Sequence, residues 1–174
     1  MVGQPEKAKE ILQASMYQQL IYFISSVTEL LTLETDNEAY FDELVERIEQ
    51  LFDIYQLKHL QVNSTLVFYL KAATGYMQQN RTERALQMLK NYTETCIHLP
   101  FPLQLHGDDH FYLLEQWIER EMKVSAQVPR DELSIKRNLI NELANNAAFA
   151  GLQGHTEYKA MLLNLKHHLK LEEE

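Results

Sequence analysis

Apolar and polar residues alternate with the period of an α-helix through residues 64–100, in two runs separated by a short polar break. The first apolar run recurs at steps of three and four residues and comprises Leu66, Tyr69, Leu70, Ala73, Tyr76 and Met77. Asn80, in the break, suits a left-handed residue that closes a helix. The period then resumes in Ala85, Leu86, Leu89, Tyr92 and Thr93. Because small residues in both runs allow two helix backbones to approach, we predict an antiparallel helical hairpin over Ser64–Pro100.

Two further helices are predicted before the hairpin. Pro5 suits the first turn of a helix over residues 5–33, and Thr35 or Asp36 suits the cap of the next one. The second helix has an apolar face made by Phe41, Leu44, Val45, Ile48, Leu51, Phe52 and Tyr55. Its other face carries acidic residues in a pattern typical of a solvated helix surface: Glu38, Asp42, Glu43, Glu46 and Glu49.

The first of these helices is apolar on much of its circumference. Its predicted inward set is Ile11, Leu12, Met16, Leu20, Phe23, Ile24, Val27, Leu30 and Leu31. A helix of this kind is usually covered on two sides. Two interpretations therefore stay open: a central core helix in a monomer, or a helix covered partly by its own domain and partly by a second subunit.

Three helices are predicted after the linker Leu99–Leu105, which its prolines hold extended. The first begins near Asp108 or Asp109, the second begins at Pro129 after a loop over Ser125–Val128, and the third follows a short break. Their inward residues are expected to be Phe111, Leu114, Trp117, Ile118 and Met122, then Leu133, Ile135, Leu139, Ile140 and Leu143, then Tyr158, Met161, Leu162, Leu165 and Leu169, with Phe149 and Leu152 as a plug between the last two helices.

Together these segments predict an all-α protein with about seven antiparallel helices. No stretch alternates polar and apolar residues over enough positions to predict a strand. The 174 residues suit a single domain with a real core. Within residues 1–174 we distinguish an N-terminal helix pair (5–60), the hairpin (64–100) and the C-terminal helices (106–170).

Charge and composition narrow the class of protein. The formal net charge is −9 and no dense basic run occurs, so direct binding of nucleic acid by this chain is not expected. The single cysteine, Cys96, is expected to be a buried structural thiol. The first residues lack the apolar core of a signal peptide, and no apolar run has the length of a membrane span. We therefore expect a cytoplasmic protein that does not bind membranes.

One cluster contains residue types that bind divalent metals: His106, Asp108, Asp109 and His110. The aspartates follow Gly107 at the expected start of a helix, so we interpret them as helix-capping residues rather than ligands. The other histidines are isolated or point apart, and the motifs of metalloproteases, phosphate-binding loops and serine hydrolases are absent from the sequence. We predict no catalytic residue, no metal and no cofactor. An enzyme would require a cavity in which histidines and carboxylates converge.

The hairpin resembles a tetratricopeptide repeat, a helix pair with aromatic, small and bulky residues at set offsets. With Ala85 as the central alanine, Tyr69, Ala73, Tyr76 and Leu89 occupy matching positions. The alternative is an ordinary amphipathic hairpin. The resemblance implies tetratricopeptide-like hairpins in a right-handed α-α superhelix.

Two consequences of the resemblance concern particular residues. Tyr92 stands where the repeat usually has a small residue, so we expect it to pack against the linker at Pro100–Pro102 and the helix that begins near Asp109. The first helix of a repeat lines a concave, ligand-binding side. The groove-facing residues would then be Val67, Leu70, Thr74, Met77 and Gln78, unless the preceding helix pair covers them.

A wider resemblance covers about two-thirds of the chain. The order LQMLKNYTE, PLQLHGDDHFYLLEQWIE and PRDELSIKRNLINELANNAAF is similar to the C-terminal regulatory part of XRE-type helix-turn-helix regulators of the Rgg and PlcR class. Those domains bind signalling peptides and dimerise. Residues 1–60 contain no recognisable helix-turn-helix, so the chain would be either a fragment without its DNA-binding domain or a stand-alone relative.

The expected function is thus a non-catalytic sensor and dimerisation domain of a bacterial transcriptional regulator. It would bind a peptide or protein partner on its helical-repeat surface and form a homodimer. The alternative is a stand-alone tetratricopeptide-like adaptor that binds a protein partner. An upstream, in-frame, basic helix-turn-helix segment would distinguish the first hypothesis from the second.

Overall fold

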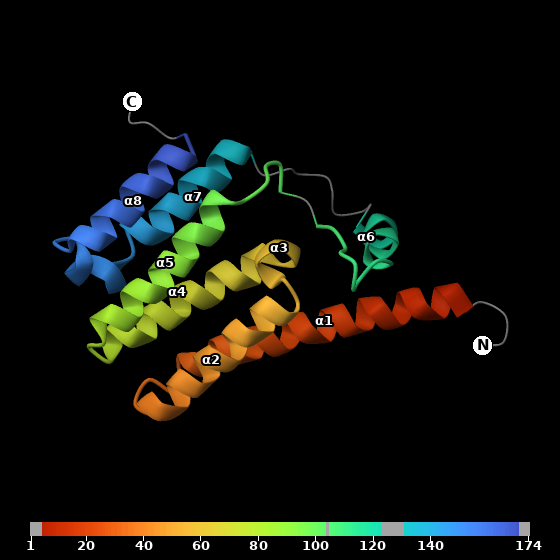
Figure 1. Ribbon diagram of the computed structural model, residues 1–174, viewed down its shortest axis with the longest axis horizontal. Coiled ribbons are helices and arrows are strands. Elements are labelled where there is room, and N and C mark those ends of the chain that lie inside the picture. The colour runs from red at the N-terminus through yellow and green to blue at the C-terminus, as the bar shows by residue number, and fades with distance from the viewer. Residues whose placement is uncertain (1–4, 104, 123–130, 171–174) are drawn as a thin grey trace.

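The computed structural model describes residues 5–103, 105–122 and 131–170, and all regular structure within these ranges is helical (Figure 1). No strand occurs in the described residues, as predicted. Eight α-helices and one 3-10 helix are present there: α1 (Pro5–Leu31), α2 (Glu38–Ile54), α3 (Leu57–Leu60), α4 (Val62–Gln78), α5 (Thr82–Ile97), α6 (Leu114–Met122), α7 (Glu132–Ala144), η1 (Ala147–Leu152) and α8 (Thr156–His168). The two elements beyond the expected seven are the short α3 and η1.

Helices α4 and α5 form the predicted hairpin near the centre of the molecule (Figure 1). Asn80 has a φ of 58°, the predicted left-handed conformation, and the next amide, of Arg81, donates to the Tyr76 carbonyl over 2.9 Å. Ala72, Ala73 and Ala85 are fully buried, as the small-residue pattern indicated. The hairpin therefore follows its sequence closely, except that α4 begins two residues early, at Val62.

Gly75, a small residue of α4, leaves room for a side chain of α2. A Cβ at this position would lie 2.4 Å from Cζ of Phe41, a ring that comes from α2. The missing side chain thus admits Phe41, which is fully buried and meets the Tyr76 ring edge-on, with centroids 4.9 Å apart. The absence of a side chain at Gly75 therefore lets Phe41 of α2 pack against α4.

The N-terminal pair differs from expectation in its cap and in one face. Asn37 caps α2 by accepting a hydrogen bond from the Tyr40 amide, so the predicted caps, Thr35 and Asp36, are wrong. The apolar face of α2 is confirmed, with Leu51 and Tyr55 half-buried and the rest buried. In α1, by contrast, four residues of the predicted inward set are exposed: Ile11, Leu12, Met16 and Phe23. Tyr17 and Ala14 are buried instead, because α6 packs against that side of α1.

The segment between α5 and α7 runs back across the molecule to α1. The linker is irregular, as predicted, with a cis peptide bond between Phe101 and Pro102. The next helix begins at Leu114 and not near Asp109, since residues 106–111 are irregular and only 112–113 form a turn before it. There the Leu113 amide donates to Oε1 of Gln13, and α6 lies along the N-terminal half of α1 (Figure 1).

The last three elements return to the hairpin. The predicted loop over Ser125–Val128 and the predicted start at Pro129 lie outside the described residues; Asp131 caps α7. Leu133 is 40% exposed, which contradicts its predicted inward position, because it lies in the first turn of α7. The plug formed by Phe149 and Leu152 is confirmed, as are the buried positions Tyr158, Met161, Leu165 and Leu169 of the last helical segment. None of the described helices is both long enough and apolar enough to cross a membrane.

Candidate functional site

A hollow lies where α4 faces α7, with Tyr92 of α5 in its lining. It has a volume of about 710 Å³, within the range of about 300–1,000 Å³ that is common for ligand sites. Residues of α4 and α7 line the two walls: Asn63, Leu66, Val67, Leu70, Lys71 and Thr74 on one side, and Ile135, Asn138, Leu139 and Glu142 on the other, with Asn146 after α7. Tyr92 contributes from α5. We call this hollow the α4–α7 groove.

Polar side chains without partners stand among the apolar residues of the groove. Asn63, Lys71, Asn138 and Glu142 make no side-chain hydrogen bond or ion pair with another described residue. Thr74 is different, since its hydroxyl donates to the Leu70 carbonyl within α4 over 2.9 Å. The groove thus offers two amides, one cation and one anion beside apolar side chains such as Val67, which is 41% exposed.

Three of the five residues that the repeat resemblance assigned to a groove line this one: Val67, Leu70 and Thr74. The other two, Met77 and Gln78, are outside its lining. Met77 is half-buried beside η1, with its Cε 3.8 Å from where a Cβ of Gly151 would lie. Gln78 is exposed near the end of α4. The predicted set therefore overlaps one wall of this hollow at three positions, and whether these residues bind a ligand stays a prediction.

The second wall was missed, although its residues share one face of α7. These residues occupy positions i, i+3, i+4 and i+7 of one helix face, which places their side chains side by side: Ile135, Asn138, Leu139 and Glu142. The sequence predicted that Ile135 and Leu139 lie inward and gave no role to Asn138 or Glu142. Only the fold shows that this face stands opposite α4.

Tyr92 joins α5 to α7 under the groove. Its hydroxyl donates to the Leu139 carbonyl over 2.8 Å, and burial raises the pKa of this tyrosine well above its usual range. The expectation that Tyr92 packs against the linker and the helix near Asp109 is therefore wrong. The side chain of Tyr92 reaches across to α7 and fixes it against α5.

Cys96 lies one turn after Tyr92 on α5 and is fully buried, as predicted. Burial raises the pKa of its thiol to about 12. The thiol is thus protonated at neutral pH and has no nucleophilic character there. It belongs to the core beneath the groove and not to a reactive site.

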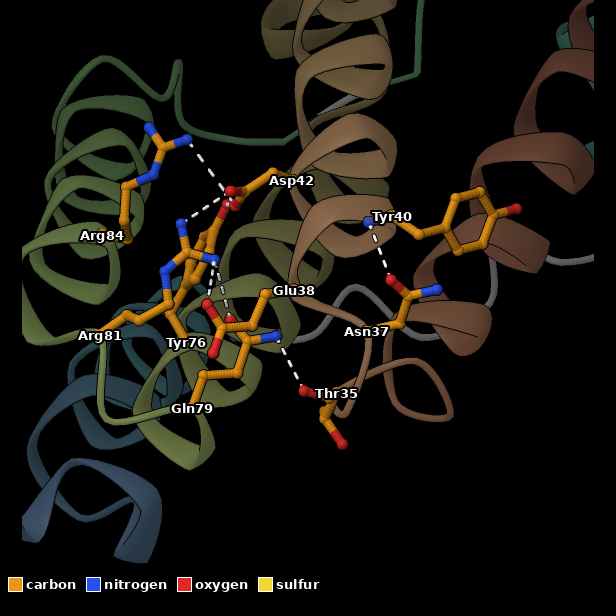
Figure 2. Close-up of polar contacts among 9 residues, drawn as sticks. All are labelled: Thr35, Asn37, Glu38, Tyr40, Asp42, Tyr76, Gln79, Arg81 and Arg84. Atoms are coloured by element: carbon orange, nitrogen blue, oxygen red, sulfur yellow. Dashed lines mark hydrogen bonds and ion pairs between the residues drawn. The ribbon is translucent and has the colours of Figure 1, made fainter.

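The other face of the hairpin carries a polar cluster whose members are all paired (Figure 2). Asp42 of α2 accepts hydrogen bonds from the Tyr76 hydroxyl at 2.8 Å and from Nη2 of Arg81 at 2.7 Å, and Nη2 of Arg84 lies 3.7 Å away. Gln79 donates to the Thr35 carbonyl over 3.0 Å. The cluster fastens the loop before α2, and α2 itself, to the turn of the hairpin.

The ionisation of Asp42 follows from these contacts. Burial opposes the charged form, but the hydrogen bonds from Arg81 and Tyr76 outweigh it and lower the pKa of the carboxyl. Burial and the bond to Asp42 raise the pKa of Tyr76. The sequence assigned Asp42 to a solvated acidic face, and the structure corrects this. Its groups are satisfied by one another, which is the pattern of a structural contact.

The histidine and aspartate cluster after the linker is arranged as a turn. Oδ1 of Asp108 accepts from the amides of His110 and Phe111 at 3.0 and 2.7 Å, which is a capping role, although α6 starts only at Leu114. The ring of His110 packs edge-on against Tyr55 and Phe111. Among the described residues, no group of three or more His, Cys, Asp or Glu side chains is placed to hold a metal ion.

The α4–α7 groove thus combines polar groups without partners and accessible apolar surface. Comparison of the chain with protein-family models, with curated proteins and with solved structures finds no match to any of them.

Proposed function

We propose that the chain is a non-catalytic regulatory domain that binds a short peptide, or an extended segment of a protein partner, in the α4–α7 groove. The observation that carries the proposal is the combination of unpartnered Asn63, Asn138, Lys71 and Glu142 with an apolar floor. A carboxamide both donates and accepts, so it complements a peptide group, whose N–H and C=O must each find a partner.

The charges in the groove support a ligand with little net charge. Lys71 and Glu142 are the charged residues of its lining, one of each sign, so neither a strongly acidic nor a strongly basic ligand is favoured. The floor formed by Leu66, Leu70 and Leu139 suits aliphatic or aromatic side chains. The ligand that fits best is therefore a peptide segment with apolar side chains and no excess charge.

The wider role is proposed from the resemblance of the hairpin and the C-terminal segments to Rgg- and PlcR-class regulators. On that basis the domain senses a peptide for a bacterial transcriptional regulator, its hairpins are tetratricopeptide-like, and it works as a homodimer. A stand-alone adaptor for a protein partner is the alternative. An in-frame, basic helix-turn-helix segment upstream of Met1 favours the regulator.

Peptide selection on the purified chain tests the groove. Random dodecapeptides displayed on phage are selected on the immobilised protein, and the enriched peptides are then measured by fluorescence anisotropy. Val67→Arg and Thr74→Arg fill and charge the groove without entering the core, so each is expected to weaken binding at least 30-fold. Leu163→Arg, at a 71% exposed position of α8, is the matched control and should bind as the wild type does. Peptides that bind all four proteins equally, or a failure to enrich any peptide, would refute the proposal.

A further inference from the structure

Another hollow lies where α6 packs against the N-terminal half of α1 (Figure 1). Its volume is about 400 Å³, which is enough for a small ligand. One wall is a single face of α1 and includes Lys7, Ile11, Ser15 and Gln18. Trp117 and Arg120 of α6 stand in the other wall. We call this the α1–α6 hollow.

The contacts of α6 run along α1 in reverse order. The Leu113 amide, just before α6, donates to Gln13 over 2.9 Å. Nη2 of Arg120, near the end of α6, lies 2.5 Å from Oε1 of Glu10. Glu10 precedes Gln13 on α1, so the end of α6 lies towards the start of α1.

The α1–α6 hollow therefore has two different ends. Lys7 and Arg120 stand at the end near the start of α1. Gln18 marks the other end, about 16 Å away along the axis of α1. Trp117 lies one turn before Arg120 on α6, so it faces the stretch between the two ends.

The middle of the hollow is apolar. The indole of Trp117 is half-buried there, and Ile11 in the opposite wall is 47% exposed. Ala14, which also belongs to the lining, contributes only a methyl group. An aromatic ring that faces a branched aliphatic side chain suits a flat ring or a branched aliphatic group between them.

The neutral polar groups of the lining can donate hydrogen bonds. Oγ of Ser15 accepts from Nε2 of Gln19 over 2.9 Å, so the hydroxyl hydrogen is left to donate. Gln18 and the indole N–H of Trp117 form no side-chain hydrogen bond with any residue that the structure describes. An indole N–H can only donate. A ligand in this hollow therefore needs acceptors.

Lys7 supplies the charge that remains open in this hollow. Arg120 is shared between two carboxylates, Glu10 at 2.5 Å and Glu121 at 3.1 Å. Lys9, the next cation along α1, is paired as well. Lys7 is exposed and has no ion pair within the described part of the chain. The hollow thus matches one negative charge, and neither a cation nor a multiply charged anion.

We infer that the α1–α6 hollow binds a monocarboxylate that carries an aromatic or branched aliphatic group. The carboxylate accepts from the Lys7 ammonium, and the apolar group lies between Trp117 and Ile11. Ser15 and Gln18 donate to any further acceptor of the ligand. A small aryl acid has this chemistry, and so does the C-terminus of a peptide that ends in an apolar residue. The site is separate from the α4–α7 groove, so the inference goes beyond the proposed function.

The fluorescence of Trp117 tests the inference, because it is the only tryptophan in the chain. The purified protein is titrated with hydrocinnamate, with the neutral amide of hydrocinnamate and with N-acetylphenylalanine. Both carboxylates should change the emission saturably. The neutral amide should bind at least about tenfold more weakly, because a neutral hydrogen bond replaces a charge-assisted one. Calorimetry on the same mixtures measures the dissociation constants independently.

Two pairs of neighbours on α1 provide matched variants. Lys7→Met keeps the length of the side chain and should weaken both carboxylates about tenfold. Lys9→Met, outside the lining, should bind as the wild type does, and Lys7→Arg should restore binding. Ile11→Ala should weaken binding about threefold or more, whereas Leu12→Ala, at a 63% exposed position outside the lining, should not. Circular dichroism checks that each variant remains helical.

Several outcomes would overturn the inference. Equal binding of hydrocinnamate and its amide is one, and equal effects of Lys7→Met and Lys9→Met are another. The absence of both a fluorescence change and a heat of binding up to about 10 mM acid is a third. Val67→Arg alters only the α4–α7 groove and should leave the constants unchanged, so a loss of binding in this variant would move the ligand to that groove.

The two carboxylates also identify the source of the ligand. Tighter binding of N-acetylphenylalanine than of hydrocinnamate assigns the hollow to the C-terminus of a peptide, because the extra amide then pairs with Ser15 or Gln18. The reverse order assigns it to a small aryl acid. Either order supports the inference.

Discussion

The α4–α5 hairpin meets α2 on one side and α7 on the other, and the two contacts differ in how completely they close. Towards α2, the ring of Phe41 fills the space left by Gly75, and Asp42 pairs with Tyr76 and Arg81. Towards α7, the Tyr92 hydroxyl holds the Leu139 carbonyl while the walls above stay apart. The same hairpin is therefore sealed on one side and leaves polar groups free on the other. The difference separates a contact that maintains the fold from a surface that is available to a ligand.

Truncation of Phe41, on the sealed side of the hairpin, should cause the largest loss of stability. Phe41 is fully buried, and Phe41→Ala leaves a cavity against Gly75 and Tyr76. The free energy of unfolding should fall by about 3–5 kcal/mol. Val67→Ala, in the open groove, should change it by no more than about 0.5 kcal/mol. Urea unfolding followed by circular dichroism measures both. Similar losses for the two variants would mean that the α7 side is as tightly packed as the α2 side.

Removal of the Tyr92 hydroxyl should have a smaller and more local effect. Tyr92→Phe removes the hydroxyl that donates to the Leu139 carbonyl. The free energy of unfolding should fall by about 1–1.5 kcal/mol. Because this bond ties α7 to α5, amide hydrogen exchange should accelerate in α7 more than in α4. The control is Tyr22→Phe, at a 72% exposed tyrosine of α1, which should change neither stability nor exchange. Uniform acceleration through the chain would show that α7 is not held separately.

The smallest predicted effect depends on pH. Asp42→Asn should destabilise by about 1 kcal/mol at pH 7, since a partly exposed, hydrogen-bonded ion pair is worth little more. Since the folded-state pKa of Asp42 lies below its ordinary 3.8, its contribution is present above that pH and is lost as the pH falls through the folded-state value. Unfolding curves of both proteins from pH 7 to pH 2.5 (about the range needed) should therefore converge at the acid end.

Glu49, on the same helix, provides a control whose pKa is shifted in the opposite direction. Burial raises its pKa, although Asn91 donates to its Oε1 over 2.7 Å. Its contribution to stability is thus complete below the ordinary value of 4.5 and decreases as the pH rises through the folded-state pKa. Glu49→Gln, which keeps an acceptor for Asn91, should gain stability relative to the wild type as the pH rises. Parallel pH profiles for the two variants would show that neither carboxyl is placed as described.

Local patterns predicted the hairpin well because its signals are local. The period of three and four residues, the left-handed Asn80 and the buried alanines all depend on residues within a turn or two. The same holds for the plug at Phe149 and Leu152. The cap of α2 was missed by one or two positions, since Thr35, Asp36 and Asn37 are all good capping residues and only the backbone path selects among them.

Features that depend on distant partners were not predictable in this way. Asp42 and Glu49 look like members of a solvated acidic face until α4 and α5 bring Arg81 and Asn91 beside them. The wrong inward set of α1 has the same origin, because α6 turned back onto Tyr17 and Ala14 instead of Leu12 and Met16. For the hollow between α4 and α7, three residues of the predicted set lie in one wall, and only the fold places the face of α7 opposite them.

The central position of the hairpin also determines how the molecule opens. Helix α4 packs against α1, α3, α5 and η1, and α5 in turn packs against α8, so neither can detach without disturbing most of the core. Their amides should exchange with solvent only through global unfolding. Helix α6 packs on α1 at a distance from the hairpin, so it can detach while the hairpin stays intact (Figure 1). Deuterium uptake would thus spread from α6 inward and reach α4 and α5 last.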